Sequence, residues 1–246
     1  MTATLDTTTS APGARTTIDA TSEVELVAYD PYKDIHKGIR AELFRVTTLA
    51  GNMDPGERCA RERLTEDVTN LFQLLVLHAE HEDDYVQPIL EVHAPFYAEV
   101  VASDHPRLEA TMAEIQGRTE RATAAPAAEQ RGRVHHIYRE LAAFTSAYLE
   151  HQDFEETKVM PALATVMSVD EIVAIDQAIV ASIPPDVMAG TLGIMLPAMN
   201  IDDRAELLGG MQAGAPPEVF AGVWALAGSV LTPADHVALG TRLGIA

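Results

Sequence analysis

The sequence predicts an all-α protein, an up-down-up-down four-helix bundle followed by a smaller helical lobe. Three observations predict this fold. Ala, Leu and Glu fill long stretches with apolar residues at helical spacing, Gly and Pro cluster between these stretches, and paired histidine–glutamate motifs recur along them. We expect a disordered tail at residues 1–24, the bundle at 25–163 and the C-terminal lobe at 164–246.

The composition and the net charge argue against several classes of protein. The first 24 residues are rich in Thr, Ala, Ser and Gly and lack the basic start and apolar core of a signal peptide, so a disordered tail is expected. A formal net charge of −20 argues against binding to nucleic acid or to an anionic membrane. Cys59 is the only cysteine, which excludes an intramolecular disulfide and is consistent with the cytoplasm.

Four long helices follow from the apolar spacing. Two proline residues interrupt the pattern: Pro106 is expected to kink the third helix or restart it, and Pro161 to end the fourth. The predicted helices are Tyr32–Leu49, Arg61–Val92, residues 96–121 and Arg131–Val159.

The pattern of the last 80 or so residues predicts short helices in place of the long helices of the bundle. Several short helices begin with a proline in their first turn, where its missing N–H group costs nothing. We expect this lobe to dock on the bundle as a cap or as the surface of a homodimer. Its predicted helices are Val169–Ile183, Pro185–Met199, Asp202–Gln212, Pro217–Ser229 and Pro233–Leu243.

Two copies of one short pattern carry the chemistry. His78 precedes Glu82 and His151 precedes Glu155 by four residues, so each pair projects from one face of its helix. Neutral imidazole and carboxylate together suit a divalent transition metal such as iron, manganese or zinc. His36 and His105 are single histidines on the other two long helices.

The four motifs are predicted to lie at one height in the bundle. Residues equidistant from a turn face each other in an antiparallel helix pair. The midpoints between successive motifs fall near Cys59, near residue 94 and near residue 130, each in or beside a run of turn residues. The motifs therefore share one layer, where metal sites of bundles are built from inward side chains.

With these motifs in place, residues 30–162 resemble the hemerythrin-like, HHE cation-binding family. The C-terminal region is also similar to an extension found in actinobacterial members. The resemblance implies an oxo- or hydroxo-bridged non-haem di-iron centre inside the bundle, with manganese as an alternative metal. It implies that His36, His78, His105 and His151 are terminal ligands and that Glu82 and Glu155 bridge the two ions.

The sequence departs from the oxygen-carrying members at two positions. Glu109 stands where they have a histidine four residues after His105, and the last motif has Glu155 at four and Glu156 at five where they have an aspartate at five. Glu109 and Glu156 are therefore candidate additional ligands, although a surface role is open for Glu109. A more anionic site stabilises ferric iron, which favours turnover or sensing over reversible oxygen carriage.

For other polar residues near the motifs, both a functional and a purely structural role are open. His81 is an additional ligand, an outer hydrogen-bond donor or a proton shuttle, or else a histidine at the rim of the site. Tyr85 and Tyr148 lie one turn from a proposed ligand and either donate a proton to bound peroxide or only pack. His93, His135 and His136 lie about 22–24 Å along their helices from the ligand layer, so we expect them to be exposed.

Four functions remain open at this stage. The leading hypothesis is a di-iron protein that binds O2 or hydrogen peroxide and decomposes peroxide or performs O2-dependent oxidation. The second is a non-catalytic protein that binds or senses O2, nitric oxide or iron. The third is a di-iron oxygenase acting on an organic substrate, and the fourth is a metal-free bundle. The sequence lacks a P-loop, a dinucleotide fingerprint and a hydrolase elbow.

Overall fold

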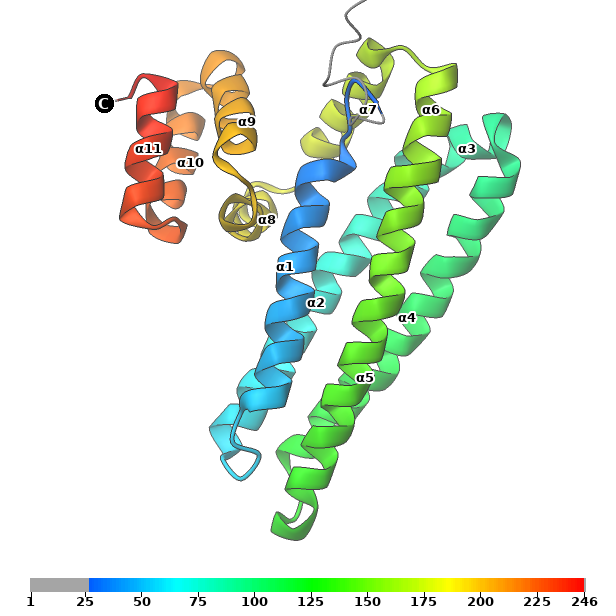
Figure 1. Cartoon of the computed structure of the whole chain (residues 1–246), viewed down its shortest axis with the longest axis vertical. Helices are drawn as coiled ribbons and strands as arrows, with labels where there is room; N and C mark the ends of the chain where they lie inside the picture. Colours follow the sequence, from blue (N-terminus) through cyan, green and yellow to red (C-terminus); the bar gives the residue numbers. More distant parts are fainter. Residues whose placement is uncertain (1–26, 246) are drawn as a thin grey trace, which may run out of the picture.

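The computed structural model describes residues 27–245 and confirms the all-α fold, since the described residues form helices and no strand (Figure 1). The predicted disordered tail at residues 1–24 lies outside the described residues. Within them, no single helix is both long and apolar enough to cross a membrane. One sharply bent helix pair, Val169–Ser182 with Pro185–Ala198, meets those requirements only when its members are taken together.

Four long helices form the bundle. Each packs against two of the others, so that α1 contacts α2, α2 contacts α4, α4 contacts α5 and α5 contacts α1. In Figure 1 the chain runs down the first, up the second, down the third and up the fourth. Their bounds are α1 Tyr32–Asn52, α2 Arg58–Tyr85, α4 Pro95–Thr123 and α5 Ala127–Phe154.

The second predicted helix is interrupted, which corrects the expectation of one helix over Arg61–Val92. Helix α2 ends at Tyr85, and a separate short helix, α3 (Gln87–His93), follows after Val86. Pro88 stands in the first turn of α3. In the first turn of a new helix the missing N–H group of proline costs no hydrogen bond, so the position of Pro88 is compatible with a restart here.

The two prolines singled out in the sequence do not stop their helices. Helix α4 runs through Pro106 without restarting. The fourth helix passes into a π-helical stretch, η1 (Glu155–Val159), and then into α6 (Met160–Val166), so the predicted end at Pro161 was wrong. Met160 N–H donates to the carbonyl of Glu155, five residues earlier. After this wider turn a new series of α-helical hydrogen bonds begins. Pro161 therefore occupies a first-turn position of α6, where proline is tolerated.

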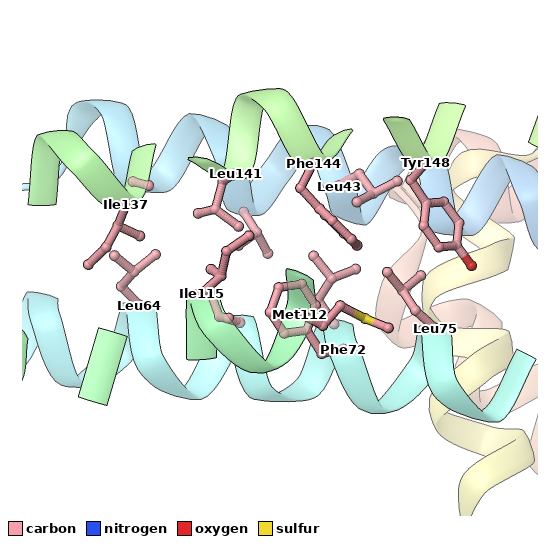
Figure 2. Packing of buried hydrophobic residues seen from close by; sticks show 14 of the residues in the cluster. Leu43, Leu64, Phe72, Leu75, Met112, Ile115, Ile137, Leu141, Phe144 and Tyr148 are labelled. Carbon is pink, nitrogen blue, oxygen red and sulfur yellow. The ribbon is translucent and has the colours of Figure 1, made fainter. Parts of the chain in front are cut away.

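Two apolar clusters fill the bundle along its length. The lower cluster packs side chains from all four long helices and ends at Tyr148 (Figure 2). The upper cluster contains Tyr32, residues of α3 and α4, Met160 and Leu163 of α6, and Ile172. Tyr32 and Tyr148 precede the ligand candidates His36 and His151 by four and three residues, so the predicted ligand layer lies between the two clusters.

The remaining helices are α7 (Val169–Ser182), α8 (Pro185–Ala198), α9 (Ile201–Gly214), α10 (Pro217–Val230) and α11 (Pro233–Leu243). Their bounds lie within a few residues of the predicted ones. Helix α7 gives Ile172 to the upper cluster of the bundle. Helices α8 to α11 share a third apolar cluster around Leu196, Leu208 and Leu239 and form a separate group in Figure 1.

The lobe docks on the helix that carries His36. Helix α8 crosses α1 at Gly38, where an added Cβ atom would lie 3.3 Å from the Cα atom of Met195. Asp203 of α9 forms ion pairs with Lys33, at 3.0 Å, and with Lys37. Gly38 therefore permits the close approach of the two helices, and the lysines on either side of His36 attach α1 to the lobe.

Candidate metal centre

The structure brings six predicted ligand residues into one layer of the bundle. His36 comes from α1, His78 and Glu82 from α2, His105 from α4, His151 from α5 and Glu155 from the start of the π-helical stretch. Their side chains are 0 to 6% exposed, apart from His78 at 10%. Charged or basic groups at such depth are costly unless they are paired or bind a metal.

Ligand atoms of these residues form two groups that share both carboxylates. One group is His36, His78, Glu82 and Glu155, and the other is Glu82, His105, His151 and Glu155, with the ligand atoms of each group within 4.8 Å of one another. The arrangement therefore offers two groups of potential metal ligands that have two carboxylates in common.

Each carboxylate directs one oxygen toward each group. Glu82 Oε1 lies 3.4 Å from His78 Nε2, while its Oε2 lies 3.3 Å from His105 Nε2. Glu155 Oε1 lies 2.9 Å from His151 Nε2, while its Oε2 lies 3.5 Å from His36 Nε2. A carboxylate placed in this way can bind one ion through each oxygen, which is how a bridging ligand acts.

The outward ring nitrogens of His36 and His105 contact other carboxylates. His36 Nδ1 lies 2.9 Å from Glu156 Oε1, and the same oxygen accepts a hydrogen bond from Arg40 Nη1 at 2.8 Å. His105 Nδ1 lies 2.9 Å from Asp83 Oδ1. Such partners fix the tautomer and orientation of a ligating imidazole and make it more basic.

Polar atoms in the layer lack the partners that burial requires. Both oxygens of Glu82, both oxygens of Glu155 and Nε2 of His105 are buried without a hydrogen bond. His36 Nε2 and His78 Nε2 lie only 3.0 Å apart. Two nitrogens bound at right angles about 2.1 Å from one ion would lie about 3 Å apart. A bound cation would satisfy all of these atoms, so the donor set fits a metal centre.

The pKa values of the metal-free cluster differ between its members. Burial lowers the pKa of His36 and of His78 to about 4, which keeps both rings neutral and able to bind metal. Burial raises the pKa of Glu155 to about 8. Burial opposes the charged form of His105 as well, but contacts with Glu82 and Asp83 outweigh it and raise the pKa of His105 to about 9. At neutral pH the last two hold protons that a metal ion must displace.

Two buried tyrosines lie next to the layer, one on each side. The ring centroid of Tyr148 lies 5.6 Å from that of His151, and the ring centroid of Tyr32 lies 5.0 Å from that of His36. Burial raises the pKa of both phenols well above the usual value, and the charges of Glu82 and Glu155 raise it further. Both therefore stay protonated and can act as hydrogen-bond donors.

The remaining sequence candidates lie outside the ligand groups. Glu109 is exposed on α4. Glu156 contacts the outward nitrogen of His36. Burial raises the pKa of Glu156, but hydrogen bonds from His36 and Arg40 outweigh this effect and lower the pKa to about 2. His81 and Tyr85 are half-buried and make no hydrogen bond or ion pair with another described residue. The three histidines far from the layer, His93, His135 and His136, are exposed.

Sequence reasoning missed four residues of this region. Tyr32 precedes His36 by four residues, a spacing that places both on one face of α1 and could have revealed it. Asp83, Asp104 and Arg40 gave no comparable signal, since charged residues on helices are usually solvent-exposed and their contacts here come from other helices.

Comparison with known protein families agrees with this geometry. The model of the hemerythrin family, described as the hemerythrin HHE cation binding domain, matches residues 27–163, more than half of the chain. No curated protein and no solved structure matches the chain significantly. The matched residues span all six side chains of the two ligand groups. The chain belongs to the hemerythrin family, with a cation-binding domain built on the four-helix bundle.

Proposed function

We propose that this chain is a non-haem di-iron protein that reacts with hydrogen peroxide or O2, decomposing peroxide or performing O2-dependent oxidation. The single observation that carries the proposal is the pair of shared carboxylates, Glu82 and Glu155, each with one oxygen toward each histidine pair. This arrangement would hold two ions next to each other, which suits two-electron chemistry with peroxide or O2.

The donor set supports iron. Two imidazole nitrogens and two carboxylate oxygens are available to each ion, and no cysteine lies among the ligand groups in the described residues. Imidazole suits iron, while carboxylate also suits manganese, so manganese is an alternative occupant. When bound, the two ions supply the redox equivalents and leave coordination positions for a small oxidant.

The depth of the site supports a small reactant rather than an organic substrate. Five of the six ligand side chains are 6% exposed or less. Two cavities between α4 and α5 are lined by residues outside the ligand groups. A diatomic molecule or hydrogen peroxide can reach such a layer through thermal fluctuations of the packing, whereas a larger substrate would need an open pocket.

The chain's own residues contribute protons and orientation. Tyr148 and Tyr32 hold their phenol protons because burial and the two bridging carboxylates oppose ionisation. Each can donate a hydrogen bond to an oxidant held between them, and the apolar clusters beyond them limit the entry of water. General acid assistance of this kind lowers the barrier to breaking an O–O bond.

The carboxylates around the histidines support turnover over reversible oxygen carriage. Glu156 and Asp83 accept from the outward nitrogens of His36 and His105 and increase the basicity of these ligands. More basic ligands stabilise the more highly charged ferric state. A ferric resting state is suited to peroxide decomposition, in which two molecules of hydrogen peroxide give one of O2 and two of water.

The test is metal analysis combined with peroxide consumption. Protein produced in iron-rich medium should contain about two irons per chain and should release O2 from added peroxide. The variant Glu82→Gln should lose both properties, and Glu80→Gln, an exposed carboxylate two residues earlier, should keep them. Two irons with a lasting spectral change but no O2 release would instead support the binding or sensing alternative. Absence of metal would refute the proposal.

A further inference from the structure

The four histidines are not equally supported by the protein. His36 and His105 each have a carboxylate 2.9 Å from Nδ1. His151 Nδ1 is buried and makes no hydrogen bond with another described residue, but Asp104 Oδ2 lies 3.6 Å from it. For His78, the only carboxylate within 4.0 Å in the described part of the chain is the bridging Glu82, on its inward nitrogen. His78 alone lacks a carboxylate on its outward side.

Exposure distinguishes the same histidine. The side chain of His78 is 10% exposed, whereas those of His36, His105 and His151 are 0, 4 and 2% exposed. Water therefore reaches the ring of His78 more readily than any other ligand ring, and no described side chain or carbonyl holds its outward nitrogen.

From these two differences we propose that the two metal positions are inequivalent. The position held by His105 and His151 is the tight one, and the position held by His36 and His78 is labile and exchanges its ion with solution on the His78 side. This inference rests on the proposed dinuclear centre. An unsupported imidazole can rotate away from its ion, while a supported one is kept in the ligating orientation, a difference that typically amounts to about 10- to 100-fold in metal affinity.

The shared carboxylates do not remove this inequivalence. Glu82 and Glu155 each place one oxygen toward either position, so their contribution to the two ions is similar. What differs is the second histidine of each position. His151 is 2% exposed and has Asp104 3.6 Å from its outward nitrogen, whereas His78 is 10% exposed and has no described carboxylate on that side. The labile position should therefore take up whichever divalent ion, iron or manganese, is available in solution after the tight position is filled.

The experiment measures release of metal from the full chain into excess chelator, with cobalt(II) as a spectroscopic probe. We expect two phases of one ion each, the faster from the labile position. His78→Gln should remove the fast phase and leave one slowly released ion per chain. A single phase carrying both ions, or loss of the slow phase in His78→Gln, would overturn the inference.

Two milder substitutions assign each phase without removing a ligand. Asp83→Asn should accelerate the slow phase by about 10- to 100-fold, because Asp83 contacts only His105 among the ligands. Asp84→Asn, the neighbouring exposed carboxylate with no described ion pair, is the matched control and should change neither phase. Acceleration of the fast phase alone by Asp83→Asn would contradict the assignment. Failure of the native protein to bind cobalt would instead refute the dinuclear centre itself.

Discussion

His36 Nδ1 lies 2.9 Å from Oε1 of Glu156, on the side of the imidazole that faces away from the ligand groups. The preceding residue, Glu155, directs both of its oxygens into the layer. Adjacent glutamates at the start of one π-helical turn thus have different roles, one in the layer and one behind a histidine.

This difference predicts different outcomes for the same substitution at adjacent positions. Glu155→Gln should abolish binding of at least one of the two ions, because a neutral amide replaces a carboxylate that faces both positions. Glu156→Gln should keep two ions per chain and weaken metal binding by about 10- to 100-fold. Metal content of the purified variants measures the number of ions, and a competition titration with chelator measures the affinity. Equal loss in the two variants would contradict the distinction between them.

Exposed histidines should be irrelevant to metal binding. His93→Ala should leave metal content unchanged because His93 is exposed on α3. His78→Ala should reduce metal content, since His78 Nε2 lies in a ligand group. Elemental analysis of the purified variants gives the comparison, and a similar loss of metal in both would show that the ligand groups are wrongly assigned.

The two phenols should affect reactivity more than metal content. Tyr148→Phe and Tyr32→Phe keep the buried ring and remove only the hydroxyl, so metal content should stay at the native level. The rate of peroxide decomposition should fall by about 10- to 100-fold, which reaches the lower end of the roughly 100- to 10,000-fold contribution that is typical of an acid–base group. Steady-state O2 release at matched iron content measures this. Native rates in both variants would show that the phenols only pack.

Metal binding should become stronger as the pH rises toward 9. In the metal-free protein the pKa of Glu155 is raised to about 8 and that of His105 to about 9, so both hold protons at pH 7. Metal must displace these protons, and raising the pH through these two values removes that competition. Calorimetry in buffers of different ionisation enthalpy should show proton release at pH 7 and less at pH 9. Binding that releases no protons would contradict the raised pKa values.

Attachment of the lobe should depend on Gly38. Gly38→Leu places a side chain against the backbone of Met195 in α8, and such overpacking costs about 1–3 kcal/mol. Gly132→Leu is the matched control, because no atom lies within 4 Å of a Cβ atom added there. Glycine inside a helix is less stable than alanine by about 0.5–1 kcal/mol, so replacing Gly132 should not destabilise the protein. Denaturant unfolding followed by fluorescence of Trp224, in the lobe, should show destabilisation only for Gly38→Leu.

The helices and their ligand motifs could be predicted because they depend on local spacing. Residues four apart on a helix share a face whatever the tertiary structure, so His78 with Glu82 and His151 with Glu155 were identifiable as pairs. The relative heights of the motifs followed from turn residues between them. The break at Val86 and the π-helical turn were missed, because the effect of Pro88 and Pro161 depends on local packing that propensity alone does not describe.

The all-α fold, the four long helices and the residues able to form the metal layer could be inferred from the amino-acid sequence. The three-dimensional arrangement was needed to learn which histidine of another helix faces each carboxylate, and that Glu156, Asp83 and Asp104 lie behind the ligand rings. These contacts join side chains on different helices. Their distances depend on helix rotation and on the approach of neighbouring backbones, and neither is encoded in the spacing along one helix.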